Sequence, residues 1–348
     1  SRQSLLSLPL NRRAHMDTEF GFWKKLNRPI FALAPMADVT DAAFRRIIAK
    51  YGKPDVMWTE FVSADGLFLA DKKGKAKLKK DLLYSEGERP IVAQFFTAHP
   101  EMMEKAAALA VKLGFDGVDI NMGCPDRSIE KQGAGAAHMK NPERALEIIC
   151  AAKRGAESAG KKIPVSVKTR IGYNKDELET WLPKLLSAEP AAITIHARTR
   201  KEMSKVPARW DAVRRAVAIR NAMKSRTLIL GNGDVLNIAD ARKKALEFGC
   251  DGVMLGRAIF GNPFLFQCSQ EHWNRNTEGL IKKKLEIMVE HTKLFEKLLG
   301  RTKNFSVMKK HYKAYVSGFS GARELREKLM AAEDATEVSK IVGQFPSS

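Results

Sequence analysis

The sequence predicts an α/β protein, a (β/α)8 TIM barrel followed by a small C-terminal helical domain. From residue 31 onward, short apolar runs rich in Val, Ile and Ala alternate with longer amphipathic segments. This alternation is typical of a parallel sheet covered by helices on both faces, and the number of repeats suits a barrel. A doubly wound sheet is the competing architecture, but its GxGxxG turn is absent after the first expected strand.

The expected elements follow the hydrophobic pattern along the chain. The strands are expected at Phe31–Met36, Asp55–Phe61, Ile91–Phe96, Gly117–Asn121, Pro164–Thr169, Ala191–Ala197, Thr227–Gly231 and Gly252–Gly256. Helices are expected at Asp41–Lys50, Glu101–Leu113, Pro142–Ser158, Asp176–Leu186, Trp210–Met223 and Ile238–Phe248.

We expect three parts in the chain: an N-terminal extension at 1–28, the barrel at 29–268 and the helical domain at 269–348. Residues 1–15 contain no acidic residue, so we interpret them as a leader outside the fold, with Met16 as a candidate native start. Residues 275–343 show helical periodicity, several Lys and Arg clusters and no further strand.

Composition restricts the partners and the compartment. The 348 residues carry a formal net charge of +20, which favours a polyanionic partner, nucleic acid before a membrane surface, over a generically basic protein. No apolar run is long enough to span a bilayer. The four cysteines form no CxxC pair, so neither a disulfide framework nor a metal site is expected. We expect a cytoplasmic monomer that does not bind membranes.

Polar residues, and other residues typical of active sites, recur where the expected strands end. They are Pro35-Met36, Gln94, Asn121 with Cys124, Lys168 with Arg170, His196, Asn232-Gly233 and Gly256-Arg257. In a (β/α)8 barrel these ends converge on one face, where active sites are found. A single such residue could be a loop or capping residue, but the repetition predicts an enzyme.

Cys124 lies in the turn Asn121 to Ser128, between a glycine and a proline. A thiol presented at a strand end is a candidate proton donor or nucleophile, although an ordinary buried cysteine is the alternative. Gly233 and Gly256-Arg257 follow the last two strands, where barrels often bind phosphate. Lys168 would suit the electron-rich ring of a flavin, and the lysine run 72–80 suggests contact with RNA.

Several segments together resemble the tRNA-dihydrouridine synthase family. They are Leu33 to Asp41 with Phe44-Arg45, Val92 to Phe95, Asn121 to Pro125, Gln132 to Ala137, Val167 to Arg170, Ile195 to Thr199, Gly231 to Asp234 and Gly256 to Pro263. The match runs through roughly residues 29–266 in order. His311-Tyr312-Lys313 is also similar to part of the family's C-terminal RNA-binding domain, though less specifically.

The resemblance implies an FMN-dependent enzyme that reduces the C5=C6 bond of selected uridines in tRNA, with NADPH as electron donor. The family's catalytic cysteine, a proton donor, falls on Cys124. Asn121, Arg170 and Arg198 would contact the substrate. The resemblance further implies that the flavin is bound by Gln94, Lys168 and His196 at the ring, Pro35 and Met36 packed against it, and Asn232, Gly233, Gly256 and Arg257 at the phosphate.

Three positions depart from the family pattern: Asp38 stands where glycine is commoner, His138 replaces an apolar residue, and Ala197 replaces a glycine. Three other functions were weighed. They are a dihydrouridine synthase acting on ribosomal RNA, a flavin barrel acting on a small molecule of the dihydroorotate type, and an RNA-binding protein with a vestigial barrel. The net charge argues against the second, and the retained polar residues argue against the third.

Overall fold

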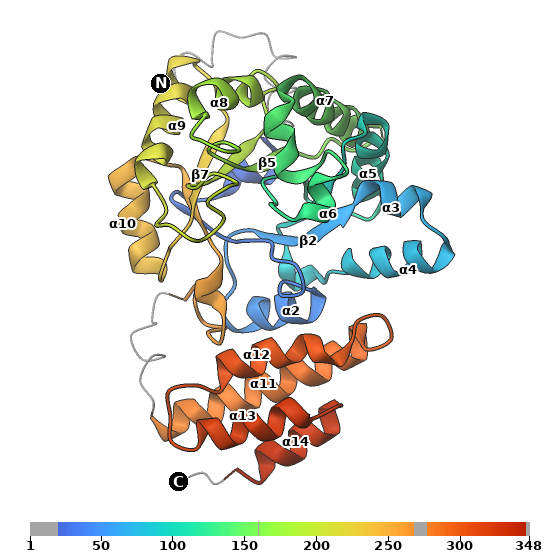
Figure 1. The fold of residues 1–348 in the computed structure, drawn as a ribbon, viewed down its shortest axis with the longest axis vertical. Helices are drawn as coiled ribbons and strands as arrows, with labels where there is room; N and C mark the ends of the chain where they lie inside the picture. The colour runs from blue at the N-terminus through green and yellow to red at the C-terminus, as the bar shows by residue number, and fades with distance from the viewer. Residues whose placement is uncertain (1–19, 159, 268–276, 346–348) are drawn as a thin grey trace.

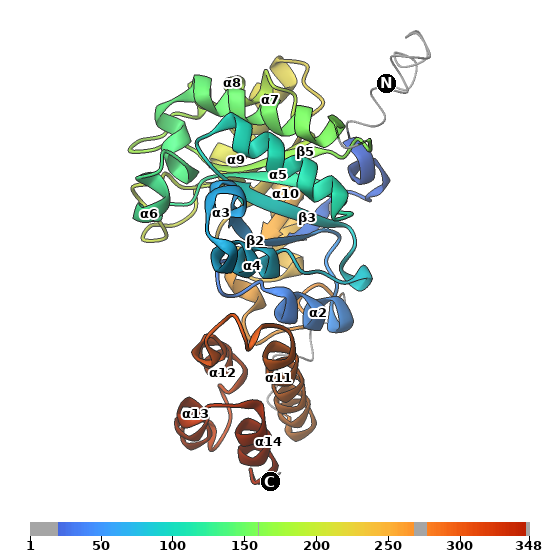
Figure 2. The same ribbon diagram turned by 90° about the vertical axis from the view of Figure 1, so that its right-hand side faces the viewer.

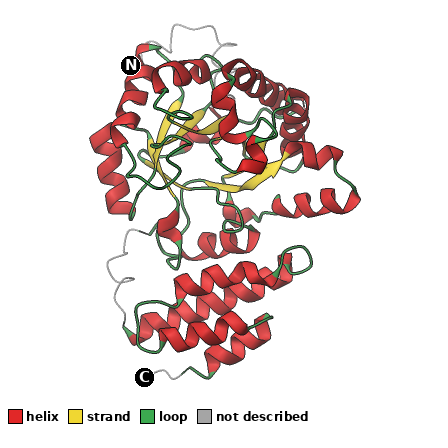
Figure 3. Cartoon of the chain, in the orientation of Figure 1, coloured by secondary structure: helices red, strands yellow, loops and turns green. Residues whose placement is uncertain are grey.

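The computed structural model describes residues 20–158, 160–267 and 277–345. The expected leader at 1–15, Met16, Cys268 and the expected boundary between residues 268 and 269 lie outside the described residues. The division into domains therefore stays a prediction, although both expected architectures are present (Figures 1 and 3).

Eight parallel strands form the sheet, in the order β1-β8-β7-β6-β5-β4-β3-β2. Their bounds are β1 Ile30–Leu33, β2 Met57–Ser63, β3 Ile91–Phe96, β4 Gly117–Met122, β5 Val165–Arg170, β6 Ala192–His196, β7 Leu228–Asn232 and β8 Gly252–Leu255. The two edge strands meet at a parallel bridge between Ala32 and Val56, where the Leu33 amide donates to the Val56 carbonyl over 3.2 Å. The sheet thus closes, which confirms the predicted barrel.

Helices pack around the strands and occupy the expected intervals. They are α2 Ala42–Tyr51, α5 Pro100–Lys112, α7 Pro142–Ser158, α8 Leu178–Leu186, α9 Trp210–Ala222 and α10 Ile238–Phe248. Three further helices were not expected from the hydrophobic pattern: α3 Ala64–Leu69, α4 Lys72–Asp81 and the single turn α6 Arg127–Glu130. None of the α4 side chains is buried, so its sequence has no apolar stripe to signal a helix.

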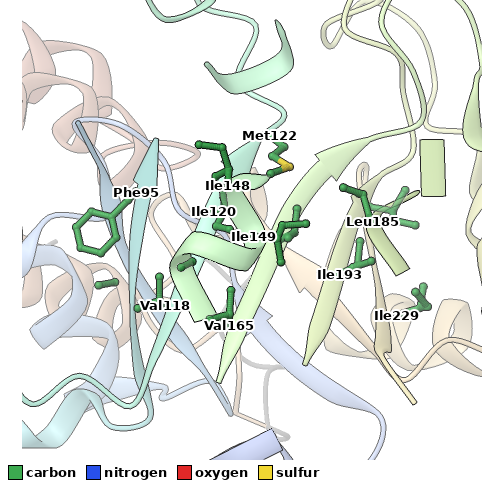
Figure 4. Packing of buried hydrophobic residues seen from close by; sticks show 14 of the residues in the cluster. Phe95, Val118, Ile120, Met122, Ile148, Ile149, Val165, Leu185, Ile193 and Ile229 are labelled. Atoms are coloured by element: carbon green, nitrogen blue, oxygen red, sulfur yellow. The ribbon is translucent and has the colours of Figure 1, made fainter. Parts of the chain in front are cut away.

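Alternation along each strand separates two cores. Side chains such as Val118, Ile120 and Ile193 point outward and pack under the surrounding helices (Figure 4). A second cluster joins Trp58 and Met254 with Trp23 from the short helix η2 Gly21–Lys25. The Trp23 and Trp58 rings lie 6.0 Å apart. Apolar side chains therefore fill part of the barrel, and the polar residues are left for the carboxyl ends of the strands.

The C-terminal helices are α11 Glu278–Leu299, α12 Lys309–Tyr315, α13 Ala322–Ala331 and α14 Ala335–Gly343. They form a bundle on the side of the barrel that carries α2 (Figures 1 and 2). Ala43 and Ile47 of α2 belong to the same apolar cluster as the bundle. Among the described residues, no helix combines the length and hydropathy that crossing a membrane requires.

Candidate active site

Strand register brings the expected polar residues side by side. Asn121 pairs with Lys168 across β4 and β5, and Arg170 pairs with His196 across β5 and β6. His196 in turn pairs with Asn232 across β6 and β7. These residues lie at or near the carboxyl ends of adjacent parallel strands, so they face one shared end of the barrel.

The Cys124 turn is held by Asn121. The Asn121 Oδ1 atom accepts hydrogen bonds from the amides of Gly123 at 3.1 Å and Cys124 at 2.9 Å. The Cys124 carbonyl accepts from the Ala136 amide at 2.9 Å. The backbone is therefore fixed on both sides of the thiol, which is half-buried.

Burial raises the pKa of the Cys124 thiol; a hydrogen bond from the Asp126 backbone opposes this shift, as do the charges of Lys168 and Arg170, while the Asp126 carboxylate adds to it. The sulfur also packs against the apolar side chains of Phe96 and Ile129. Desolvation disfavours the thiolate, so at neutral pH the group carries its proton. This protonation state suits a proton donor and not a thiolate nucleophile.

Asn121 and Gln94, both predicted site residues, belong to a buried polar row whose other members, Asp119 and Ser166, the sequence analysis missed. Asn121 Nδ2 donates to Gln94 Oε1 at 3.2 Å, and Gln94 Nε2 donates to Asp119 Oδ2 at 2.6 Å. Ser166 Oγ donates to the second Asp119 oxygen at 2.5 Å. Burial raises the pKa of Asp119 to about 6. Residues two positions apart in a strand point to the same face of the sheet. Because Asn121 was expected to face the site, the same pattern could have identified Asp119.

Lys168 places a cation in this setting. Its pKa falls to about 8, first because of burial and then because of Arg170, while Asp119 opposes the shift. Within the described part of the chain, Lys168 forms no ion pair, and its hydrogen-bonding capacity is available to a ligand. A half-buried ammonium group without an anionic partner is costly, which is the arrangement expected where a bound molecule supplies the negative charge.

Arg170, the last residue of β5, connects two loops, the one after β4 and the one after β6. Its Nε donates to the Gly123 carbonyl at 2.8 Å, and Nη1 donates to the carbonyls of Thr199 at 3.1 Å and Met203 at 3.0 Å. These bonds support the catalytic turn from below. The predicted contact between Arg170 and the substrate stays a prediction.

Arg198 is 2% exposed and engages protein partners. Its Nε donates to the Val206 carbonyl at 2.6 Å, Nη1 donates to His196 Nε2 at 3.1 Å, and Nη2 pairs with Asp234. This geometry gives Arg198 a positioning role, and its predicted substrate contact stays untested. Since a guanidinium only donates, His196 Nε2 is the unprotonated ring nitrogen.

His196 remains neutral at physiological pH. Burial is the main cause of its lowered pKa, and Lys168, Arg170, Arg198 and Arg257 lower it further. The hydrogen on Nδ1 is then the one that His196 can donate to a ligand.

Asp234, which the sequence analysis quoted only as part of a turn, pairs with two arginines. Besides Arg198, it accepts from Arg257 Nη2 at 2.8 Å, and these partners keep its pKa below the usual range. Arg257 itself is 66% exposed, so its guanidinium retains room for an anion. Asp234, which follows β7, thus sets the positions of two cations, Arg198 after β6 and Arg257 after β8.

The glycine turns leave space that side chains would occupy. Gly233 has φ +124°, and a Cβ atom there would lie 2.9 Å from Ala208 Cβ and 3.1 Å from His196 Cδ2. At Gly256 a Cβ would lie 3.8 Å from the Met36 sulfur, so the backbone lies beside the half-buried Met36, with Pro35 buried next to it. Asn232 is tied to the Met254 carbonyl by a 2.8 Å bond.

These observations fit a flavin. The unpaired Lys168 ammonium and the neutral His196 can meet the polar edge of the ring, and Arg257 with the Gly233 and Gly256 backbones can meet the phosphate. No group of three metal-binding side chains occurs among the residues described.

Two departures from the family pattern have structural explanations. Asp38 adopts φ +53°, the left-handed region that glycine favours, and its amide is held by Glu60 at 2.5 Å. His138 is 1% exposed and bonds to the Thr97 carbonyl at 3.0 Å. Burial lowers its pKa to about 4, so it acts as a neutral anchor for the segment after Cys124.

The fold and the residues at the barrel mouth together define an enzyme of the flavin-binding barrel class. A family model described as "Dihydrouridine synthase (Dus)" matches residues 32–346. The chain belongs to this family, whose members are flavin-dependent oxidoreductases.

Curated relatives agree over nearly the whole chain. The chain is 38% identical to "Probable tRNA-dihydrouridine synthase 2" of Bacillus subtilis (strain 168), covering 93% of this chain and 96% of the relative. It is 37% identical to "Probable tRNA-dihydrouridine synthase" of Staphylococcus aureus (strain MRSA252), covering 93% and 95%. A solved histamine dehydrogenase from Rhizobium sp. 4-9 shares the fold, with a TM-score of 0.51 and 12% identity over 76% of this chain and 48% of the dehydrogenase.

Proposed function

We propose that this chain is a cytoplasmic tRNA-dihydrouridine synthase that uses FMN and NADPH to reduce the C5=C6 bond of uridines in tRNA. The names of its relatives, which align with this chain over nearly their whole length, support the substrate class. The formal net charge of +20 suits a large polyanion and has no role with a small neutral substrate. We further propose that the enzyme works as a monomer.

When bound, the reduced flavin supplies the hydride that reaches C6 of the uracil. The Cys124 thiol donates its proton to C5, so that one hydride and one proton saturate the double bond. The resulting thiolate recovers a proton from solvent. Asn121 holds the thiol in place through the backbone of the turn, and it is proposed to contact the uracil edge together with Arg170 and Arg198.

The observation that carries this proposal is the protonated, half-buried thiol fixed beside the Lys168 ammonium at the barrel mouth. A cation there stabilises the negative charge that a reduced flavin carries. The target uridine must leave its stack to reach the thiol, at a cost of a few kcal/mol, which favours flexible loop nucleotides.

The test is nucleoside mass spectrometry on unmodified tRNA incubated with NADPH and either wild-type protein or Cys124→Ala. We expect dihydrouridine from the wild type and a rate lower by roughly 10²–10⁴-fold from the variant, the usual contribution of a positioned proton donor. The variant should retain its flavin, because alanine keeps the backbone hydrogen bonds that hold the turn. Equal rates would refute the proton-donor role. Product with ribosomal RNA alone, or with a pyrimidine small molecule alone, would refute the tRNA assignment.

A further inference from the structure

Helix α4 carries six lysines that the proposed chemistry does not use: Lys72, Lys73, Lys75, Lys77, Lys79 and Lys80. In the part of the chain that the structure describes, none of their side chains forms an ion pair or a hydrogen bond. Exposed arginines elsewhere behave differently: Arg209 pairs with Glu202 at 2.5 Å, and Arg154 pairs with Glu104 at 2.9 Å. Apart from Lys77, whose charge acts on the Asp81 carboxylate, the α4 lysines are therefore a local excess of uncompensated charge.

This helix is unfavourable by itself. Like charges three and four residues apart repel along its surface, and Gly74 weakens its interior. The helix is held at its ends, where Asp71 accepts from the Gly74 amide at 2.7 Å and Leu78 packs against the barrel core. A polyanion on the outer surface would relieve the repulsion.

The outward surface of α4 is formed by Lys72, Lys73, Lys79 and Lys80, all of them exposed. Residues seven positions apart lie two turns apart on the same side of a helix. Lys79 is therefore on the same side as Lys72, and Lys80 on the same side as Lys73. We call these four residues the lysine face.

The lysine face lies at the rim that carries the catalytic turn. Asp81, the last residue of α4, is 3.5 Å from Lys303, which binds Glu60 of β2 at 2.6 Å. The next residue of β2, Phe61, packs in the same apolar cluster as Cys124. Figure 1 shows α4 projecting from the barrel on the side of the C-terminal bundle.

We propose that the lysine face binds the phosphate backbone of the RNA substrate and holds the RNA across the barrel mouth. The proposal rests on the proposed function, because it takes RNA as the substrate. A membrane surface fits less well: a helix that lies in a bilayer interface presents large apolar side chains opposite its charges, whereas no side chain of α4 is buried and Leu78 faces the protein.

The experiment replaces Lys72, Lys73, Lys79 and Lys80 together with glutamine and measures tRNA affinity from 50 to 300 mM salt. A matched control replaces Lys53, Lys105, Lys112 and Lys243 with glutamine. These four lysines are also exposed and unpaired among the described residues, and they lie on α5, on α10 and after α2. Both variants lose four positive charges, so a difference in tRNA affinity between them depends on where the lysines lie and not on the net charge.

Each phosphate contact contributes roughly 0.7–0.9 to the slope of log affinity against log salt. We expect the α4 variant to lose about 10-fold or more in tRNA affinity at 150 mM salt and up to about three units of slope. Its unfolding temperature should equal or exceed that of wild type, because the repulsion is gone. The control should change affinity less than about threefold.

Equal affinity and slope in the two variants would overturn the proposal, as would a loss confined to binding of anionic lipid vesicles. Dihydrouridine formation by the wild type is measured in the same tRNA. If the wild type makes none, the proposed function fails; if it does and the α4 variant binds as the control does, only the lysine face is refuted.

Discussion

At the scale of single residues, two groups with opposite pKa shifts divide the reaction between them. Burial raises the pKa of the Cys124 thiol above its ordinary value, and burial lowers the pKa of Lys168 to about 8. At pH 7 both groups therefore carry their protons, the thiol neutral and the amine positive. The Cys124 thiol can therefore donate a proton, and the Lys168 ammonium can stabilise negative charge. A thiolate could not donate a proton, and a neutral amine could not stabilise negative charge in this way.

The two half-reactions should consequently respond differently to pH. Oxidation of reduced flavin by tRNA needs the thiol form of Cys124, so we expect its rate to stay level from about pH 6 to about pH 7.5, where Lys168 also keeps its charge, and to fall as the pH rises further and the thiol loses its proton. Rapid-mixing absorbance at single turnover measures this step. A rate that rises with pH across this range would show that the thiolate is the active form.

Flavin retention should follow Lys168. Its cation is present below pH about 8 and is lost as the pH rises through that value, so we expect Lys168→Met to bind flavin more weakly at pH 7 by about 1–3 kcal/mol, the range for a charge-assisted hydrogen bond. Equilibrium dialysis at pH 7 and pH 9 tests this. Lys168→Arg, which stays charged, should bind flavin with the same affinity at pH 7 and pH 9. If flavin affinity depends on pH in Lys168→Met as it does in the wild type, Lys168 is not the source of that dependence.

Much of this site could be predicted from the sequence because strand-end residues in a barrel must converge. That argument correctly predicts that Asn121, Lys168 and His196 lie on the same face of the barrel. It could not find Asp119, because the role of Asp119 depends on its hydrogen bonds to Gln94 of β3 and Ser166 of β5. It also could not show that Arg198 forms an ion pair with Asp234, because contacts between two loops depend on tertiary packing.

At the scale of elements, one lysine joins the bundle to the barrel. Lys303 follows α11, is 8% exposed, and lies among Glu60 at 2.6 Å, Asp81 at 3.5 Å and Asp38 at 3.6 Å. Burial raises the pKa of Asp81 to about 6, and Lys303 opposes that shift. The sequence shows only an isolated lysine in a loop, and four separate segments must meet before its role is visible.

Lys303→Met should therefore destabilise the protein by roughly 3–5 kcal/mol at pH 8, because it leaves Glu60 charged and buried without its partner. Lys303 also neutralises Asp81, whose pKa burial raises to about 6; the charged form of Asp81 is therefore costly above about pH 6, and its protonation relieves that cost as the pH falls. The deficit of the variant should thus shrink between pH 8 and pH 5. Chemical denaturation at the two pH values measures it.

The double variant Lys303→Met/Glu60→Gln is the matched control. Glutamine can still accept the Asp38 amide but carries no charge, so we expect it to recover much of the lost stability at pH 8. If the single variant is as stable as wild type, or if the double variant is no better than the single one, the buried charge is not what Lys303 neutralises.

At the scale of the whole molecule, the bundle and the barrel share a core. Phe44 and Ile47 of α2 are each 1% exposed, and the Phe44 ring lies 5.6 Å from His291 and 5.2 Å from His311 of the bundle. The sequence predicted two architectures correctly but gave no sign of this contact, because α2 reads as an ordinary barrel helix with one apolar stripe.

Removing residues 270–348 should therefore damage the barrel itself. Each fully buried apolar side chain that becomes exposed costs about 1.5–3 kcal/mol, and loss of Lys303 leaves Glu60 unpaired. Together these costs are comparable with the 5–15 kcal/mol that stabilises a typical domain. We expect the truncated chain to unfold at least 10 °C lower or to aggregate, measured by differential scanning calorimetry and size-exclusion chromatography. A truncated barrel that keeps its flavin and its unfolding temperature would show that the shared core contributes little, and the bundle could then be treated as an independent attachment for RNA.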